Sequence, residues 1–157
     1  YQIPHPFGGM SVFENLLVAA AFGTGRTEAA CHGPCVEVLE RTRLLPKANV
    51  AAGRLTLLER KRLELARALA TGPKALLLDE IAGGLTDSEC QELIATIREI
   101  HAGGVSIIWI EHVVHALLAV VGRLIVINFG REIAQGAPAA VMADPAVQEI
   151  YLGIEAA

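Results

Sequence analysis

Two short apolar runs stand out in the hydrophobic pattern of the chain. They cover residues 75–78 and 105–110, and acidic residues follow directly, Asp79-Glu80 after the first run and Glu111 after the second. Apolar runs of this length, bounded by turn residues and interrupted here only by Ser106, are typical of strands that are buried on both faces of a parallel sheet. We therefore expect two such strands, each with acidic side chains at its carboxyl end.

Helical periodicity covers much of the remaining chain. Three helices are expected to begin at a capping box, in which Ser11, Thr56 or Thr86 is followed three residues later by Glu. These helices are expected to end near Phe22, at Ala70 and near Ala102. Further helical segments are expected at 28–45, with Gly33-Pro34 interrupting the first half, and at 113–121, 137–142 and 145–152.

The order of the expected elements indicates the fold class. Strands at 75–78, 105–110 and 123–128 alternate with helices at 86–102 and 113–121. Such an alternation predicts βαβ units and a right-handed parallel sheet. A glycine-containing turn at 128–131 then predicts a hairpin with a last strand at 132–134. The chain is thus expected to have an α/β fold.

Composition narrows the class of protein. The 157 residues have the length of one domain, and a hydrophobic content of 53% is enough for a packed core. The 13 basic residues are scattered, the net charge is -4 and only 4% of the residues are aromatic. These values argue against nucleic acid as a partner, because nucleic-acid binding needs a basic surface and side chains on which bases stack.

The cysteines and the longest apolar runs argue against two further classes. Cys31, Cys35 and Cys90 are odd in number and form no disulfide framework, and no second ligand pair at zinc-site spacing follows the first two. We expect buried or inert thiols. The longest apolar runs, 16–22 and 113–121, are too short to span a bilayer.

The acidic pair Asp79-Glu80 has two interpretations when only the residues are considered. Ligands of open α/β sheets bind beyond the carboxyl ends of the strands, where two carboxylates could hold a metal ion or activate a water molecule. Alternatively, the strand leaves the core there and meets solvent through ordinary charged residues. The motifs around the pair favour the first interpretation.

These motifs follow one another in a fixed order. They are Leu63 to Ala70, Pro73, Ala75 to Glu80, Gly84-Leu85 and Ile110-Glu111-His112. The succession resembles the C-terminal two thirds of an ATP-binding-cassette (ABC) ATPase, the nucleotide-hydrolysing subunit of ABC transporters, over nearly the whole chain. The resemblance implies a partial P-loop NTPase fold, with a parallel sheet core and an α-helical subdomain, and it implies ATP and Mg²⁺ as cofactors.

The resemblance gives roles to four residues. Gln2 is similar to the Q-loop glutamine, which contacts Mg²⁺ and the nucleophilic water and links the site to the membrane subunits. Asp79 resembles the Walker B aspartate that holds Mg²⁺, and Glu80 resembles the catalytic glutamate that orients or deprotonates the attacking water. His112 resembles the switch histidine, which contacts the γ-phosphate.

The nucleotide-contacting signature of the family departs from its usual sequence here. Leu-Ser-Gly-Gly-Gln aligns with Leu55-Thr56-Leu57-Leu58-Glu59, so that Thr56 keeps the hydroxyl. Leu57 and Leu58 replace both glycines, which crowds the approach of the backbone to a phosphate, and Glu59 is acidic where the family has a neutral amide. The resemblance therefore implies weaker contact with the ATP of a partner subunit.

A phosphate-binding Walker A motif is missing from the sequence. The pattern Gly-x-x-x-x-Gly-Lys-Ser/Thr does not occur, so we expect that the chain forms no complete ATP site unaided. In the family this motif precedes the Q-loop. The N-terminus also lacks an initiator Met and a signal-peptide pattern, and we expect Tyr1 to be an internal residue of a longer chain.

The ends of the chain are similar to the branched-chain amino acid importer branch of the family, at residues 1–16, 130–141 and 144–153. This likeness implies transmembrane permease subunits and a second ATP-binding subunit, joined head to tail, as partners at the cytoplasmic face of the bacterial inner membrane. The expected domains are a Q-loop and α-helical subdomain at 1–71, a sheet core with Walker B, D-loop and switch histidine at 72–136, and a C-terminal helical tail at 137–157.

A second function class stays open from the sequence. Because the phosphate-binding motif is missing, the chain could be a non-catalytic α/β interaction module that binds no nucleotide by itself and contacts a partner through a sheet edge and an apolar helix. Weak or absent binding of MgATP by this chain suits both classes, whereas tight binding recovered on adding an N-terminal segment would leave only the ATPase.

Overall fold

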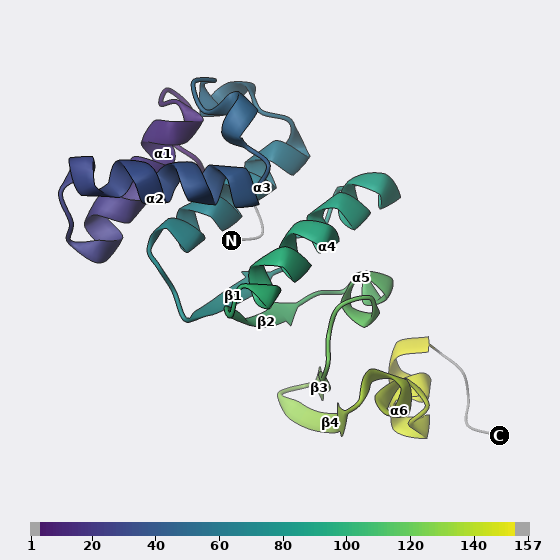
Figure 1. The fold of residues 1–157 in the computed structure, drawn as a ribbon. Helices are drawn as coiled ribbons and strands as arrows, with labels where there is room; N and C mark the ends of the chain where they lie inside the picture. Colours follow the sequence, from purple (N-terminus) through teal and green to yellow (C-terminus); the bar gives the residue numbers. More distant parts are fainter. Residues whose placement is uncertain (1–3, 153–157) are drawn as a thin grey trace. The chain divides into compact units, whose positions relative to one another are not determined.

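A computed structural model of the protein describes residues 4–152 (Figure 1). The chain divides into two compact units, one within residues 1–116 and the other within residues 117–157. The first unit contains Asp79, Glu80 and His112, so these candidate site residues share one unit. No helix among the described residues combines the length and the apolarity that crossing a bilayer requires.

Helices form most of the first unit. They are α1 (Val12–Thr24), α2 (Glu28–Arg41), α3 (Leu57–Ala70) and α4 (Asp87–Ala102), with short 3₁₀ turns η1 (Leu45–Lys47) and η2 (Ala52–Arg54) between α2 and α3. Figure 1 shows α1, α2 and α3 lying together, and α1 packs against both of the others. Leu16, Leu39 and Leu63, one from each helix, are fully buried in their common core.

All three predicted capping boxes are confirmed. In each box the hydroxyl of Ser11, Thr56 or Thr86 accepts a hydrogen bond from the backbone amide three residues later, and the glutamate at that position accepts one from the amide of the capping residue. Two of the four backbone amides that have no partner within a helix are satisfied in this way. The starts of α1, α3 and α4 are therefore set by local sequence.

We expect Thr86→Ala to lower the free energy of unfolding by about 1 kcal/mol, because α4 loses the hydroxyl that caps its first turn. Thr27→Ala is the matched control. Thr27 also precedes a helix, α2, but its side chain makes no capping hydrogen bond. Urea unfolding of the parent and both variants measures the difference, and equal losses in the two variants would contradict the importance of the capping box.

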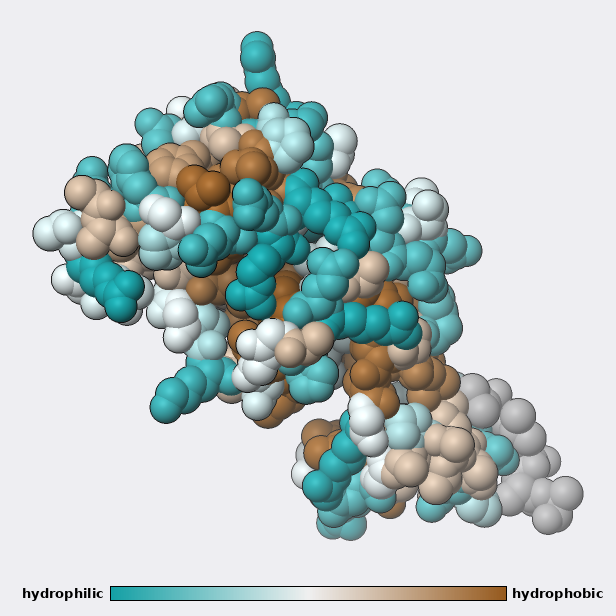
Figure 2. Space-filling view, in the orientation of Figure 1, coloured by the Kyte–Doolittle hydropathy of each residue, from teal (hydrophilic) through white to brown (hydrophobic). Residues whose placement is uncertain are grey.

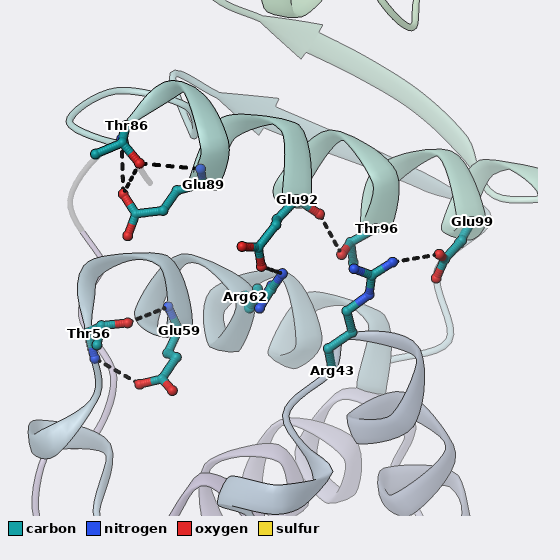
Figure 3. A network of polar contacts seen from close by, with 9 residues as sticks. All are labelled: Arg43, Thr56, Glu59, Arg62, Thr86, Glu89, Glu92, Thr96 and Glu99. Atoms are coloured by element: carbon teal, nitrogen blue, oxygen red, sulfur yellow. Dashed lines mark hydrogen bonds and ion pairs between the residues drawn. The ribbon is translucent and has the colours of Figure 1, made fainter.

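Two ion pairs attach α4 to the helices beneath it (Figure 3). Arg62 of α3 lies 2.9 Å from Glu92, and Arg43, which follows α2, lies 2.8 Å from Glu99. The guanidinium-bearing side chain of Arg62 is only 9% exposed, whereas the side chains of Arg43 and Glu99 are about half exposed. Exposed pairs contribute little to stability, so the partly buried Arg62–Glu92 pair is the more important contact.

Pro34 lies inside α2, which is continuous, so the predicted interruption at Gly33-Pro34 is wrong. Proline has no amide hydrogen and leaves the carbonyl four residues earlier, that of Ala30, without its helical partner. Ala30 and Pro34 are both exposed, and water can replace the missing bond there. The opposite face of α2 packs into the core through Cys31, Cys35, Val38 and Leu39.

The predicted parallel pairing is confirmed. β1 (Ala75–Asp79) and β2 (Ser106–Ile110) form a two-stranded parallel sheet in which Asp79 lies opposite Ile110. Parallel strands in this register end at the same edge. The acidic residues that follow each strand are therefore brought to one place.

The prediction that this sheet is buried on both faces is wrong for the described chain. Leu76 and Leu78 are 4% and 7% exposed, whereas Leu77 between them is 78% exposed. Only one face of β1 packs against the helical core, so successive side chains alternate between core and surface. Figure 2 accordingly shows apolar residues reaching the surface among the polar ones.

The second unit contains the predicted hairpin, formed by β3 (Leu124–Asn128) and β4 (Arg131–Gly136). The prediction that this first strand continues the parallel sheet is wrong, because β3 pairs with β4 alone in the part of the chain that the structure describes. Phe129 and Gly130 both have positive φ, the geometry of a two-residue turn that places the next strand antiparallel to the first.

Short helical segments complete the chain. They are α5 (Val114–Leu118), α6 (Pro138–Met142), α7 (Pro145–Val147) and a π-helical turn, η3 (Gln148–Leu152). α5 ends before the predicted residue 121, where the β-branched Val120 and Val121 disfavour a helix. In the second unit the hydroxyl of Tyr151 donates a 2.6 Å hydrogen bond to the carbonyl of Ile127 and so fixes η3 on the hairpin.

Candidate functional site

The carboxyl edge of the β1–β2 sheet brings Glu80 and His112 together. Glu80 follows β1 directly, and its amide donates a 2.8 Å hydrogen bond to the carbonyl of Ile110, the last residue of β2. Nδ1 of His112 lies 3.8 Å from Oε2 of Glu80. This distance is too long for a hydrogen bond but short enough for both side chains to contact one small ligand group.

The backbone of Glu80 adopts a conformation that is unusual for its residue type. Its φ is +47°, in the left-handed region, which costs a residue with a Cβ of the order of 1 kcal/mol. The turn sends the chain away from the sheet immediately after β1 and leaves the Glu80 side chain 32% exposed. Glu80 is thus reachable from solvent and held by its surroundings at the same time.

Asp79 is the last residue of β1 and is exposed. It lines a hollow of about 320 Å³, together with Lys61 and Arg67 of α3. Cationic side chains attract phosphate groups, and a carboxylate is a ligand that Mg²⁺ prefers. Within residues 4–152 no three His, Cys, Asp or Glu side chains gather as a metal-binding group, and Gln2, the other predicted magnesium contact, lies outside the described residues.

Glu111 is the residue at this edge to which the sequence assigned no role. Its side chain is fully buried, and its two carboxylate oxygens accept hydrogen bonds from backbone amides. Oε1 accepts from Ala82 at 2.7 Å, and Oε2 accepts from His112 at 3.1 Å and from Val113 at 3.4 Å. An acidic residue directly after an apolar strand was the available signal, but the pattern could not show that the carboxylate turns inward.

The negative charge of Glu111 affects the pKa values of two other side chains, Lys61 and Cys90. Burial lowers the pKa of Lys61, which is 6% exposed on α3, and the carboxylate of Glu111 partly offsets that shift. Burial also raises the pKa of the Cys90 thiol on α4, and Glu111 and Asp87 raise it further, so that Cys90 stays protonated. The Glu111 carboxylate therefore lies close enough to α3 and α4 for its charge to act on a side chain of each.

The signature segment forms the start of α3. The hydroxyl of Thr56 accepts from the amide of Glu59 at 3.3 Å, and the carboxylate of Glu59 accepts from the amide of Thr56 at 2.9 Å (Figure 3). Lys47 lies 3.2 Å from the same carboxylate. Leu58 is buried, and Leu57 is 41% exposed.

The carboxylate of Glu59 therefore already has partners next to it, the amide of Thr56 and the ammonium group of Lys47. Burial raises its pKa, but the hydrogen bonds with Thr56 and the contact with Lys47 outweigh burial and hold the pKa below its usual value. The polar groups of Thr56 and Glu59 are used in the capping box. A phosphate that approached this helix start would meet a carboxylate as well as the helix dipole.

Comparisons with known proteins identify relatives of the chain. The family described as "Branched-chain amino acid ATP-binding cassette transporter" matches residues 131–157. Over 98% of its length, the chain is 37% identical to the high-affinity branched-chain amino acid transport ATP-binding protein LivG of Salmonella typhimurium and 33% identical to BraF, the protein of that description from Pseudomonas aeruginosa. The chain covers 66% of each relative, about two thirds of their length.

Solved structures share the fold. The ADP conformation of MJ1267, an ATP-binding cassette of an ABC transporter, matches with a TM-score of 0.84 and 28% identity, covering 98% of this chain and 66% of that one. A nucleotide-free ATP-binding cassette from an ABC transporter matches with a TM-score of 0.82, also at 28% identity, covering 98% of this chain and 67% of that one. By sequence and by fold, the chain belongs to the ABC ATPase family, in the branch of the branched-chain amino acid transporters.

Proposed function

We propose that the chain is part of the ATP-binding subunit of an ABC importer, which hydrolyses MgATP to drive uptake of branched-chain amino acids. The approach of Glu80 and His112 to 3.8 Å, from the ends of two parallel strands, is the observation that carries this proposal. The relatives named for branched-chain amino acid transport support the solute class.

The proposed chemistry uses the residues at the sheet edge. Glu80, which is solvent-accessible, orients the attacking water and accepts its proton, and His112 contacts the γ-phosphate. Asp79, with Gln2, would hold Mg²⁺, because carboxylate and amide oxygens are the ligands that this ion prefers. When bound, Mg²⁺ neutralises charge on the phosphate oxygens.

The proposed partners follow from the same family. A second ATP-binding subunit, joined head to tail, would present its nucleotide to Thr56, Leu57, Leu58 and Glu59, and permease subunits would anchor the pair at the cytoplasmic face of the bacterial inner membrane. The sequence divisions at 1–71, 72–136 and 137–157 would then be the helical subdomain, the sheet core and the tail. The carboxylate of Glu59 and the two leucines weaken that contact relative to a glycine-containing signature.

Binding of MgATP tests the proposal against the alternative of an interaction module. The full-length gene product should bind MgATP, and removal of Mg²⁺ with EDTA should weaken the affinity by about tenfold or more, because the carboxylate of Asp79 would then face the phosphates without a cation between them. Isothermal titration with ATP, with and without Mg²⁺, measures both affinities. A full-length product that binds no nucleotide in either condition would leave the interaction module as the better description.

A further inference from the structure

The carboxylate of Glu111 connects two loops at the candidate site. One of its oxygens accepts from the amide of Ala82, in the segment that follows Glu80. The other accepts from the amides of His112 and Val113, in the segment that follows β2. A single side chain thus joins the loop after the proposed catalytic glutamate to the loop that carries the switch histidine.

Because the Glu111 carboxylate is buried, it depends on these hydrogen bonds. A buried carboxylate is costly unless hydrogen bonds or an opposite charge compensate for the lost water. Glu111 receives three backbone N–H groups, and the buried Lys61 on α3 supplies an opposite charge nearby. The side chain is 0% exposed, in contrast to 32% for Glu80 and 66% for His112, so it is a fixed anchor and does not meet solvent.

The neighbouring geometry needs such an anchor. Glu80 is held in the left-handed region, which a glutamate does not favour, and the Ala82 amide lies two residues further along the same turn. On the other side, the anchored amide is that of His112 itself. A shift of either loop would change the separation between the Glu80 carboxylate and the His112 ring.

We propose that Glu111 is a positioning residue, which sets the Glu80–His112 separation by holding the Ala82 amide and the His112 and Val113 amides on one carboxylate. This inference rests on the roles proposed above for Glu80 and His112. Glu111 touches no reacting atom in this scheme. Oε2 of Glu111 also lies 3.6 Å from Nδ1 of His112, so its effect on hydrolysis is exerted through the two loops and the His112 ring.

The variant Glu111→Gln tests whether this connection between the two loops affects the rate of ATP hydrolysis by the full-length gene product. The amide of glutamine keeps the size of the side chain but directs an NH₂ group at backbone N–H donors, so one side of the connection is lost. We expect kcat for ATP hydrolysis to fall roughly 10- to 100-fold with KM for ATP changed by no more than about twofold, because misplacement of reacting groups slows the chemical step. Glu99→Gln, which removes an exposed carboxylate from α4, should leave kcat unchanged.

The variant Glu111→Asp distinguishes the effect of side-chain length from the effect of negative charge. Aspartate keeps the negative charge but is one methylene shorter, so it can reach the Ala82 amide or the His112 amide but not both. The proposal expects Asp to lower kcat as much as Gln does. A variant with Asp that hydrolyses ATP at the parent rate would show that charge alone suffices, and would overturn the proposal, as would an unchanged kcat in Glu111→Gln.

Amide hydrogen exchange of the unmodified protein gives a readout that needs no variant to fold. The Ala82 amide lies outside regular structure and is protected by Glu111, so it should exchange about tenfold more slowly, or slower still, than the amide of Gly83. Equal exchange rates at the Ala82 and Gly83 amides would overturn the proposal that Glu111 holds the Ala82 amide. If instead the full-length gene product binds and hydrolyses no ATP while the Ala82 amide remains protected, the proposed function fails and the connection through Glu111 survives, so the two failures are distinguishable.

Discussion

Replacement of Glu80 by Gln is expected to lower ATP hydrolysis by the full-length gene product about 10²- to 10⁴-fold, the range by which a general base accelerates a reaction. Glutamine keeps the size of the side chain and leaves the backbone hydrogen bond to Ile110 in place, but it cannot accept a proton from water. Because no charge-bearing contact to the phosphates is assigned to Glu80, affinity for MgATP should stay close to that of the parent.

Steady-state phosphate release and nucleotide titration of the same preparation measure both quantities. Glu37→Gln, which changes an exposed glutamate on α2, is the matched control and should behave as the parent does. Hydrolysis by Glu80→Gln at a rate within a few-fold of the parent would remove Glu80 from the proposed mechanism. A joint loss of binding and hydrolysis would point to a disturbed turn, because Glu80 is held at a φ of +47°.

Local signals allowed the helix starts and the sheet edge to be predicted. A capping box is complete within four residues, so Ser11, Thr56 and Thr86 identify their helices without help from the rest of the fold. The parallel pairing of β1 and β2 also follows from sequence, because an apolar run, a helix and a second apolar run have few alternative arrangements.

Two of the features that were predicted wrongly are the interruption of α2 at Pro34 and the place of β3 in the parallel sheet. Pro34 was expected to break α2, but the buried face of that helix outweighs one missing hydrogen bond on the exposed side. The hairpin of β3 and β4 was predicted from its turn, but β3 was also expected to continue the parallel sheet, and within the described residues it pairs with β4 alone. Neither outcome is encoded in the hydrophobic pattern of the segment itself.

The candidate site shows the same limit. Glu80 and His112 were given roles through the family resemblance, and the structure brings their side chains to 3.8 Å at the ends of two parallel strands. The sequence did not predict that Glu111, between β2 and His112, turns inward to the Ala82 amide. Direction of a side chain at a strand end depends on the backbone of the next turn, and a residue pattern carries no information about that.

The two faces of β1 provide the second large expected effect. Leu76→Ala should lower the free energy of unfolding of the 157-residue chain by about 2–5 kcal/mol, the range for a buried leucine that leaves a cavity. Leu77→Ala, one position along the same strand, should change it by less than about 0.5 kcal/mol, because that side chain is 78% exposed against 4% for Leu76.

Urea unfolding of the parent and the two variants compares the same substitution in the same strand, so differences in strand propensity largely cancel. A loss at Leu77 as large as that at Leu76 would show that its face of the sheet is covered in solution, as the hydrophobic pattern alone predicts. A large loss at Leu76 alone would show that the continuous apolar run of β1 is buried on one face, and that its outer leucine contributes nothing to the stability of this chain.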